Sequence, residues 1–169
     1  MTKDILVPDK MFNSIYEITP SLLKKDGINT VVFDVDNTVA PYSVTVPTER
    51  MKKYLFSLRD AGINVCFASN NNAERLERFN GSLGFFSVSK AGKPSGRAVK
   101  RAMKKFSSSR ESTLVVGDQL FTDCLCARFA GVKAYIVKPI DPQSEGWFVK
   151  LKRFFEKPHL EKFRRRRKK

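Results

Sequence analysis

Two aspartates stand one residue apart in the segment VVFDVDNT, which covers residues 31–38. Asp34 and Asp36 follow an apolar run, and carboxylates this close together repel one another and are disfavoured in apolar surroundings. A compensating charge, or a reaction that uses both groups, is therefore expected. The simpler alternative is that the pair shapes a turn or caps a helix.

Other polar residues end other apolar segments. Ser69 is the last residue of the run INVCFAS, and Asn70 follows it. Lys93 lies between a glycine and a proline. Asp118 directly follows the run STLVVG, and Asp123 comes five residues later. In an open α/β sheet, the carboxyl ends of the strands form the ligand-binding edge. These groups are therefore expected to meet at that edge.

Such a set of groups suits phosphoryl transfer. Three nearby carboxylates call for a divalent cation between them, and hard oxygen ligands that leave room for substrate phosphate suit Mg²⁺. Ser69 and Lys93 would bind phosphate oxygens, while one carboxylate attacks phosphorus and its neighbour handles the proton of the leaving group. The constellation predicts a phosphatase-like site.

Short β-branched and aromatic runs alternate with amphipathic segments through the middle of the chain, which predicts βαβ units. Strands are expected at 30–35, 63–69, 85–88, 112–117 and 132–137. Helices are expected around 20–25, from Pro47 and Thr48 to just before Gly62, and at 72–83, 95–106, 122–130 and 147–155. The predicted fold is a three-layer, Rossmann-like α/β sandwich with a five-stranded parallel sheet.

The 169 residues are expected to form one domain over 1–156, followed by a basic, disordered tail over 157–169. The net charge is +15, of which the tail carries +7, so anionic partners are favoured. Solvated charge with no partner is the alternative for the tail. Trp147 and Phe148 are expected to be core or staple residues rather than a lipid anchor.

The chain shows no secretory signal pattern and no apolar stretch of about 18 residues, so we expect it to remain in the cytoplasm, with contact at the inner face of a membrane as a further option. Cys66, Cys124 and Cys126 are odd in number and lie in apolar segments, which favours buried thiols in a reducing compartment. A metal or redox role for the C-x-C pair is the weaker alternative.

Four segments carry a resemblance to a known family. DVDNT resembles the DxDxT signature of the haloacid dehalogenase (HAD) superfamily of phosphatases, and FASNN, KAGKPSG and VVGDQLFTD resemble its second, third and fourth motifs in order. The details are similar to the YqeG-like group of subfamily IIIA, whose eukaryotic relatives dephosphorylate phosphatidylglycerophosphate in mitochondria. The resemblance implies the strand order 3-2-1-4-5.

The resemblance also implies roles for the site residues. Asp34 would be the nucleophile, and Asp36 the general acid and then the general base. Mg²⁺ would be held by Asp34, the backbone carbonyl of Asp36, and Asp118. The remaining roles are substrate binding by Ser69, Asn70 and Lys93, orientation of Lys93 or of a metal-bound water by Asp123, and support of the turn by Thr38.

Neither connection where HAD enzymes often insert a cap domain is long enough to hold one: residues 39–62 are mostly one helix, and residues 69–93 are equally short. The site is therefore expected to be uncapped and to admit phosphates attached to something large. A lipid phosphate such as phosphatidylglycerophosphate, with the tail on an anionic membrane, is the first expectation. The alternatives are a basic RNA- or ribosome-associated binding protein with a secondary phosphatase site, and a phosphatase of nucleic-acid or protein phosphates. The oligomeric state is left open.

Overall fold

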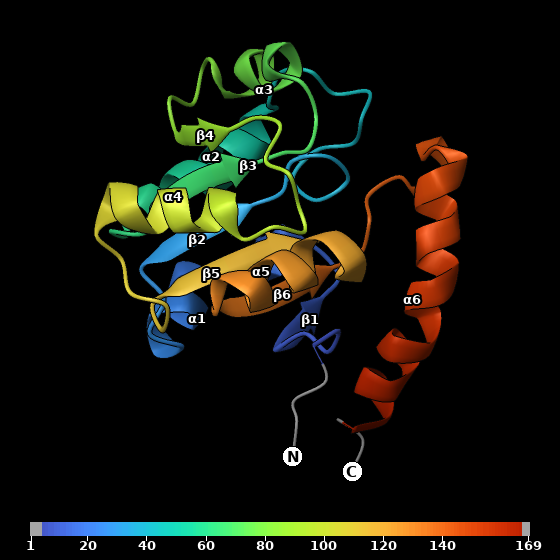
Figure 1. Ribbon diagram of the computed structural model, residues 1–169. Coiled ribbons are helices and arrows are strands. Elements are labelled where there is room, and N and C mark those ends of the chain that lie inside the picture. The colour runs from blue at the N-terminus through green and yellow to red at the C-terminus, as the bar shows by residue number, and fades with distance from the viewer. Residues whose placement is uncertain (1–4, 167–169) are drawn as a thin grey trace.

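Six parallel strands form one sheet in the order β1-β6-β5-β2-β3-β4 (Figure 1). The structure is a computed structural model that describes residues 5–166. The strands are β1 (Lys10–Phe12), β2 (Thr30–Phe33), β3 (Asn64–Ala68), β4 (Phe86–Val88), β5 (Thr113–Gly117) and β6 (Lys133–Val137). The helices are α1 (Pro20–Lys25), α2 (Glu49–Asp60), α3 (Ala73–Asn80), α4 (Arg97–Phe106), α5 (Leu125–Ala130) and α6 (Trp147–Arg166), with a π-helical segment η2 (Leu120–Cys124) and the 3-10 turns η1 (Ile15–Glu17) and η3 (Pro142–Ser144).

The five predicted strands are present, and their order matches the implied 3-2-1-4-5. The sheet has a sixth strand, β1, which pairs with β6 at the edge. Sequence analysis missed β1 because its three residues are only partly buried and show no clear period. The fold class is confirmed, with six strands in place of five.

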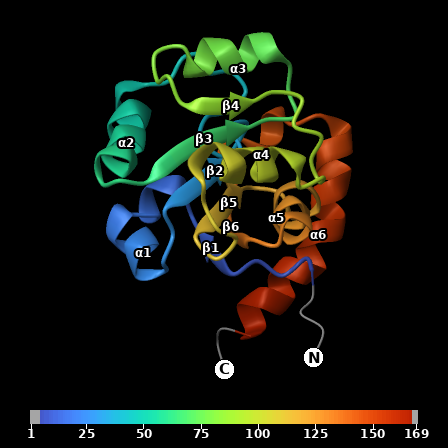
Figure 2. The same ribbon diagram turned by 60° about the vertical axis from the view of Figure 1, so that its left-hand side comes forward.

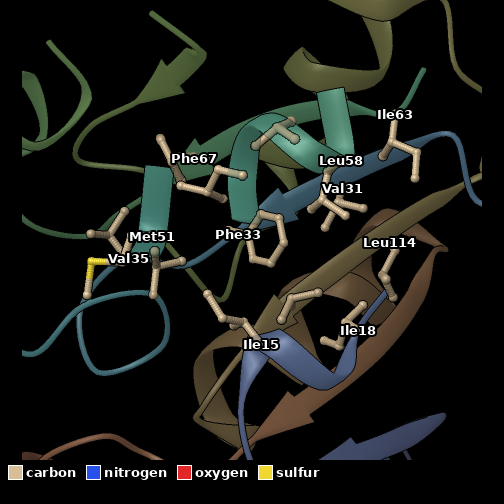
Figure 3. Close-up of a cluster of buried hydrophobic side chains, with 14 of the residues drawn as sticks. Ile15, Ile18, Val31, Phe33, Val35, Met51, Leu58, Ile63, Phe67 and Leu114 are labelled. Atoms are coloured by element: carbon tan, nitrogen blue, oxygen red, sulfur yellow. The ribbon is translucent and has the colours of Figure 1, made fainter. Parts of the chain in front are cut away.

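Two hydrophobic layers cover the sheet. One joins the side chains of η1, α1, α2 and α3 to one face of the strands, and Figure 3 shows its centre around Phe33, Leu58 and Phe67. The other joins the small side chains of α4 and α5 to the opposite face, including Ala98, Ala127 and Val115. Figures 1 and 2 show helices on both sides of the sheet, which is the three-layer arrangement.

The helix after Pro47 illustrates how local signals set the boundaries. The Thr48 side chain accepts a hydrogen bond from the amide of Met51 at 3.3 Å, as an N-cap residue does. Met51, Leu55 and Leu58 lie buried on one face of α2. Gly62 has a φ of 83°, a left-handed conformation that lets the chain turn into β3.

The connections on either side of β3 are short. Between β2 and β3 the chain forms a loop and α2, and between β3 and β4 it forms α3 and a short turn. Neither connection contains a cap domain, as predicted. The carboxyl edge of the sheet is therefore left to the loops and to α6.

The last helix differs from its prediction. A helix over 147–155 and disorder from Lys157 were expected, but α6 continues to Arg166, with Glu156 and Phe163 buried. The basic composition concealed this continuation, since the buried side that holds the helix against the domain consists of a few widely spaced residues. Residues 167–169 of the predicted tail lie outside the described part of the chain. No helix among the described residues is long and apolar enough to cross a bilayer.

The three cysteines are free and buried, as predicted. The thiol of Cys124 lies near the carbonyl of Ile5, and that of Cys126 donates to the carbonyl of Ser95 at 3.2 Å. Burial raises the pKa of each thiol to about 12. Each is therefore a protonated core residue at neutral pH, and the C-x-C pair does not form a metal site with the acidic groups of residues 5–166.

Candidate active site

The nucleophile candidate stands where the central strand ends. The backbone amide of Asp34 donates to the carbonyl of Val116 at 2.8 Å, which continues the pairing of β2 with β5. The carbonyl of Val35 then accepts the amides of Val39 and Ala40, both at 3.0 Å, and closes a tight turn. Asn37 occupies this turn at a φ of 61°, a conformation that Asn tolerates better than most residues. The turn sets Asp34 and Asp36 at the carboxyl edge of the sheet.

Lys93 joins two of the predicted carboxylates. Its Nζ lies 2.5 Å from Oδ1 of Asp34 and 2.7 Å from Oδ1 of Asp123, with only 4% of its side chain exposed. Burial opposes the charge, but Asp123 and Asp34 raise the pKa of Lys93. Lys93 is therefore a fixed positive charge beside the nucleophile candidate.

Three buried carboxylates form a group that could hold a metal ion. Oxygens of Asp34, Asp118 and Asp123 lie within 4.8 Å of one another. The Thr38 hydroxyl lies 3.3 Å from Oδ2 of Asp34 and 3.1 Å from Oδ1 of Asp118. These contacts bring together the ends of β2 and β5 and the segment after β5, as predicted.

The pKa values of two carboxylates in this group are raised, mainly by burial. Burial raises the pKa of Asp34; Lys93 opposes the shift, and Asp123 and Asp118 add to it. Burial, together with Asp123, raises the pKa of Asp118 to about 6, against the effect of Arg153. Three carboxylates with oxygens this close together fit a hard divalent cation.

A glycine makes room for Asp123. A Cβ atom at Gly117 would lie 2.1 Å from Cγ of Asp123, so no side chain fits there while the carboxylate keeps its place. The carboxylate also accepts the amide of Gln119 at 3.2 Å. The motif VVGDQLFTD thus needs its glycine so that Asp123 can pack against the end of β5.

Asp36 points to a different set of partners. Its Oδ1 accepts Nε of Arg75 at 2.6 Å, and its Oδ2 lies 3.3 Å from the Ser69 hydroxyl and 3.4 Å from Nδ2 of Asn71. Its carboxylate is thus directed toward α3 and away from the Asp34, Asp118 and Asp123 group. This orientation is compatible with the implied use of its backbone carbonyl as a metal ligand, which stays a proposal.

Asn70 holds the loop that carries Lys93. Its Oδ1 accepts the amide of Lys93 at 2.8 Å, and its Nδ2 donates to the carbonyl of Lys93 at 3.1 Å. Asn70 also lines the site pocket. Because its amide group is engaged on both sides, the geometry favours a positioning role over the predicted direct contact with substrate.

Sequence reasoning missed a network that reaches the site from α6. Arg153 contacts the carboxylates of both Asp118 and Glu145, and its Nε lies 2.5 Å from Oε2 of Glu145. Glu145 in turn accepts Nδ2 of Asn37 at 2.8 Å. Arg153 was hidden among the many basic residues of the C-terminal region, and Arg75 in the first turn of α3 was missed as well. The one sequence signal for Arg75 was its place in the first turn of a predicted helix, which would begin at the carboxyl edge of the sheet.

The site opens into a pocket of about 280 Å³. Its lining includes Asp34, Asp36, Lys93 and Asp123, together with Tyr42, Val149 and Lys152, which were not predicted. Burial and the neighbouring Asp36 raise the pKa of Tyr42 to about 12, so its phenol keeps its proton at neutral pH and can donate a hydrogen bond. Val149 and Lys152 come from α6, which thus forms one wall of the pocket.

Comparisons with known proteins agree with this geometry. The HAD-hydrolase-like family model matches residues 90–139. The probable phosphatase YqeG of Bacillus subtilis (strain 168) is 32% identical over 166 residues, covering 98% of this chain and 96% of that protein. Phosphatidylglycerophosphate phosphatase 1, chloroplastic/mitochondrial, of Arabidopsis thaliana is 26% identical, and the match covers 97% of this chain but 50% of that protein.

The fold has solved counterparts. The cobalt-bound form of the deoxy-D-mannose-octulosonate 8-phosphate phosphatase (YrbI) from Haemophilus influenzae superposes with a TM-score of 0.55 at 21% identity, covering 76% of this chain and 77% of that one. A hypothetical protein from Xanthomonas campestris, XCC2798, gives a TM-score of 0.56 at 17% identity, covering 79% and 78%. The similarity to YqeG across nearly the whole of both chains shows that this chain belongs to the HAD superfamily of phosphatases.

Proposed function

We propose that this phosphatase is a Mg²⁺-dependent phosphomonoesterase that works through an aspartyl-phosphate on Asp34. The observation that carries the proposal is the placement of Asp34 in an open pocket, with its carboxylate 2.5 Å from Nζ of Lys93 and beside the Asp118 and Asp123 carboxylates. The resemblance of the sequence motifs to those of subfamily IIIA supports the same assignment.

In the proposed first step, an oxygen of Asp34 attacks phosphorus while the bond from phosphorus to the leaving oxygen breaks. Asp36 gives its proton to that leaving oxygen. Ser69 and Lys93 bind the oxygens of the transferring group, and Lys93 offsets their charge. In the second step Asp36 takes a proton from water, which attacks phosphorus, releases phosphate and restores the Asp34 carboxylate.

The proposed metal ligands are Asp34, the backbone carbonyl of Asp36, and Asp118, with Asp123 close enough to bind directly or to orient Lys93 or a metal-bound water. The donor set fits Mg²⁺ because it consists of oxygens and lies in a group of three buried carboxylates. When bound, Mg²⁺ would neutralise charge on the phosphoryl oxygens.

The proposed substrate is a phosphate attached to a large or membrane-bound molecule, with phosphatidylglycerophosphate first. The pocket is uncapped, and the Arabidopsis relative is a phosphatidylglycerophosphate phosphatase. The net charge of +15 favours an anionic substrate surface. The proposed location is the cytoplasmic side of a membrane, and the three free thiols support a reducing compartment.

Phosphate release from a panel tests this function. The panel contains phosphatidylglycerophosphate in mixed micelles, a phosphorylated oligonucleotide, a phosphopeptide, small sugar phosphates and para-nitrophenyl phosphate. Wild type should release phosphate fastest from the lipid, and Asp34→Asn should lose at least about 10³-fold on every substrate, because Asn keeps the shape of the side chain but cannot form the aspartyl-phosphate. Asp60→Asn, at an exposed position on α2, is the matched control and should keep full activity.

The same panel separates the alternatives. Faster turnover of the oligonucleotide or the phosphopeptide would replace the lipid substrate. Tight RNA binding that accompanies negligible turnover of every phosphate would favour the basic binding protein instead, since salt-sensitive RNA binding needs only the positive surface. Retained turnover in Asp34→Asn would refute the aspartyl-phosphate mechanism.

A further inference from the structure

Helix α6 carries large apolar side chains that face solvent. Trp147 is 76% exposed and Phe154 65% exposed, and Phe148, Leu151 and Phe155 are also exposed. The aromatic rings pair with one another, Trp147 with Phe148 at 5.8 Å and Phe154 with Phe155 at 5.6 Å between ring centroids. Of the prediction that Trp147 and Phe148 are core or staple residues, the core assignment is wrong, because the helix turns its other side to the domain.

These five residues form one continuous surface, which we name the aromatic stripe. Their spacing at positions 147, 148, 151, 154 and 155 places them within an arc of roughly 120° at 3.6 residues per turn. The residues that hold α6 to the domain lie on the other side of the helix: Arg153 contacts Asp118, Glu156 accepts the amide of Phe121 at 2.9 Å, and Phe163 is buried. Figure 1 shows α6 standing to one side of the sheet.

Positive charge surrounds the stripe. The helix contains eight Lys and Arg against two Glu, and both Arg153 and Glu156 are turned toward the domain. Among the side chains that the structure describes, Lys150 and Lys157 are exposed, and Lys152 lies 4.7 Å from the ring of Phe148. An apolar stripe of Trp, Phe and Leu bordered by Lys is the pattern of a helix that lies in a membrane interface.

We propose that the aromatic stripe of α6 docks the enzyme on an anionic lipid bilayer. Lys152 lies 4.7 Å from the ring of Phe148 and also lines the pocket, so the basic border of the stripe reaches one wall of the pocket. Use of the surface to present a lipid phosphate rests on the proposed function, whereas the docking itself does not.

Charge decides between a bilayer and a second copy of the chain. Two copies joined stripe to stripe would bring two strongly basic helices together, which opposes association. An anionic bilayer complements both the apolar residues and their basic border. The proposed lipid contact is therefore made by the stripe of helix α6, whereas the sequence analysis expected it from the tail over 157–169.

The chain carries its own probe, because Trp147 is its single tryptophan. We would titrate the full-length protein with vesicles of phosphatidylglycerol and phosphatidylcholine in equal parts, and with vesicles of phosphatidylcholine alone. Docking predicts a blue shift of Trp147 emission and quenching by lipids labelled in the upper acyl chain, with at least about tenfold weaker binding to the neutral vesicles. Unchanged emission on the anionic vesicles would overturn the proposal.

Substitutions then test the stripe itself. The triple variant Phe148→Ser, Leu151→Ser, Phe154→Ser should bind the anionic vesicles at least about tenfold more weakly in cosedimentation. Its turnover of para-nitrophenyl phosphate should stay within about twofold of wild type, which reports an intact fold and site. The matched control is Val46→Ser, Phe129→Ser, which removes two similarly exposed apolar side chains elsewhere and should bind vesicles like wild type.

The outcomes are distinct. Equal vesicle binding by wild type and the triple variant would overturn docking by the stripe. A wild-type dimer that the triple variant converts to monomer, with vesicle binding unchanged, would assign the stripe to self-association and also overturn it. Vesicle docking by a wild type that hydrolyses no phosphate of the panel would support the docking proposal while the proposed function fails.

Discussion

Arg153 on α6 contacts the carboxylate of Asp118 at the end of β5, so a helix outside the sheet reaches into the candidate metal group. The same guanidinium contacts Glu145, and neither carboxylate has appreciable exposure. Arg153 therefore neutralises buried charge and joins α6 to the active site. The dependence of the site on α6 follows from this pair.

Replacement of Arg153 should destabilise the fold. Arg153→Met leaves the buried carboxylates of Asp118 and Glu145 without their cation, and loss of one partner from a buried ion pair costs about 3–5 kcal/mol. Urea unfolding should show this decrease in the free energy of unfolding, while Lys150→Met, at an exposed position on the same helix, should change it by less than about 0.5 kcal/mol. Equal stability of the two variants would show that the Arg153 contacts do not hold α6 in place.

Mg²⁺ should stabilise the protein independently of turnover. A cation that binds only the folded state adds about 2.7 kcal/mol at a concentration of 100 times its Kd, so the melting temperature should rise with Mg²⁺ and return with EDTA. Asp118→Asn removes one carboxylate of the group and should lose most of this shift. If the melting temperature of wild type does not change with Mg²⁺, the metal site is refuted, whether or not the protein releases phosphate.

The acid role of Asp36 predicts a dependence on the leaving group. Asp36→Asn should slow hydrolysis of an alkyl phosphate such as glycerol phosphate by about 10²-fold to 10⁴-fold, the usual range for general acid–base catalysis. Para-nitrophenyl phosphate should lose less, because its leaving group needs little protonation. Steady-state rates on both substrates decide the matter, and equal losses would exclude Asp36 as the acid of the first step.

Glu156 should make stability depend on pH. Burial raises its pKa from 4.5 to about 7; the amide of Phe121 and Arg153 oppose the shift, and Asp118 adds to it. The folded state therefore binds this proton more tightly than the unfolded chain, so the group favours folding most below pH 4.5 and loses that contribution as pH rises through 7.

Glu156→Gln removes this titration while keeping an acceptor for the amide of Phe121. Relative to wild type, the variant should gain roughly 1–3 kcal/mol in the free energy of unfolding between pH 4.5 and pH 8, measured in urea at each pH. Glu161→Gln, exposed on the same helix, is the control and should follow wild type. A variant curve parallel to that of wild type would contradict the raised pKa.

Several features could be predicted from the sequence because their causes are local. Buried β-branched runs such as TVVF and TLVVG indicate strands, and Thr48 and Gly131 mark helix ends through their own side chain or backbone. Polar residues directly after such runs, including Asp34 and Asp118, must meet because parallel strands end at one edge. For this reason the sequence could predict the fold class and the proximity of Asp34, Lys93, Asp118 and Asp123.

Tertiary structure alone decided the contacts that join separate elements. Arg75 lies 39 residues from Asp36, and Arg153 lies 35 residues from Asp118, and no local pattern distinguishes either arginine from the other basic residues. The same holds for α6, whose composition permits either side to face the domain. The buried partners of Arg153 and Glu156 fix the orientation of α6. In this orientation Trp147 and its neighbours face solvent.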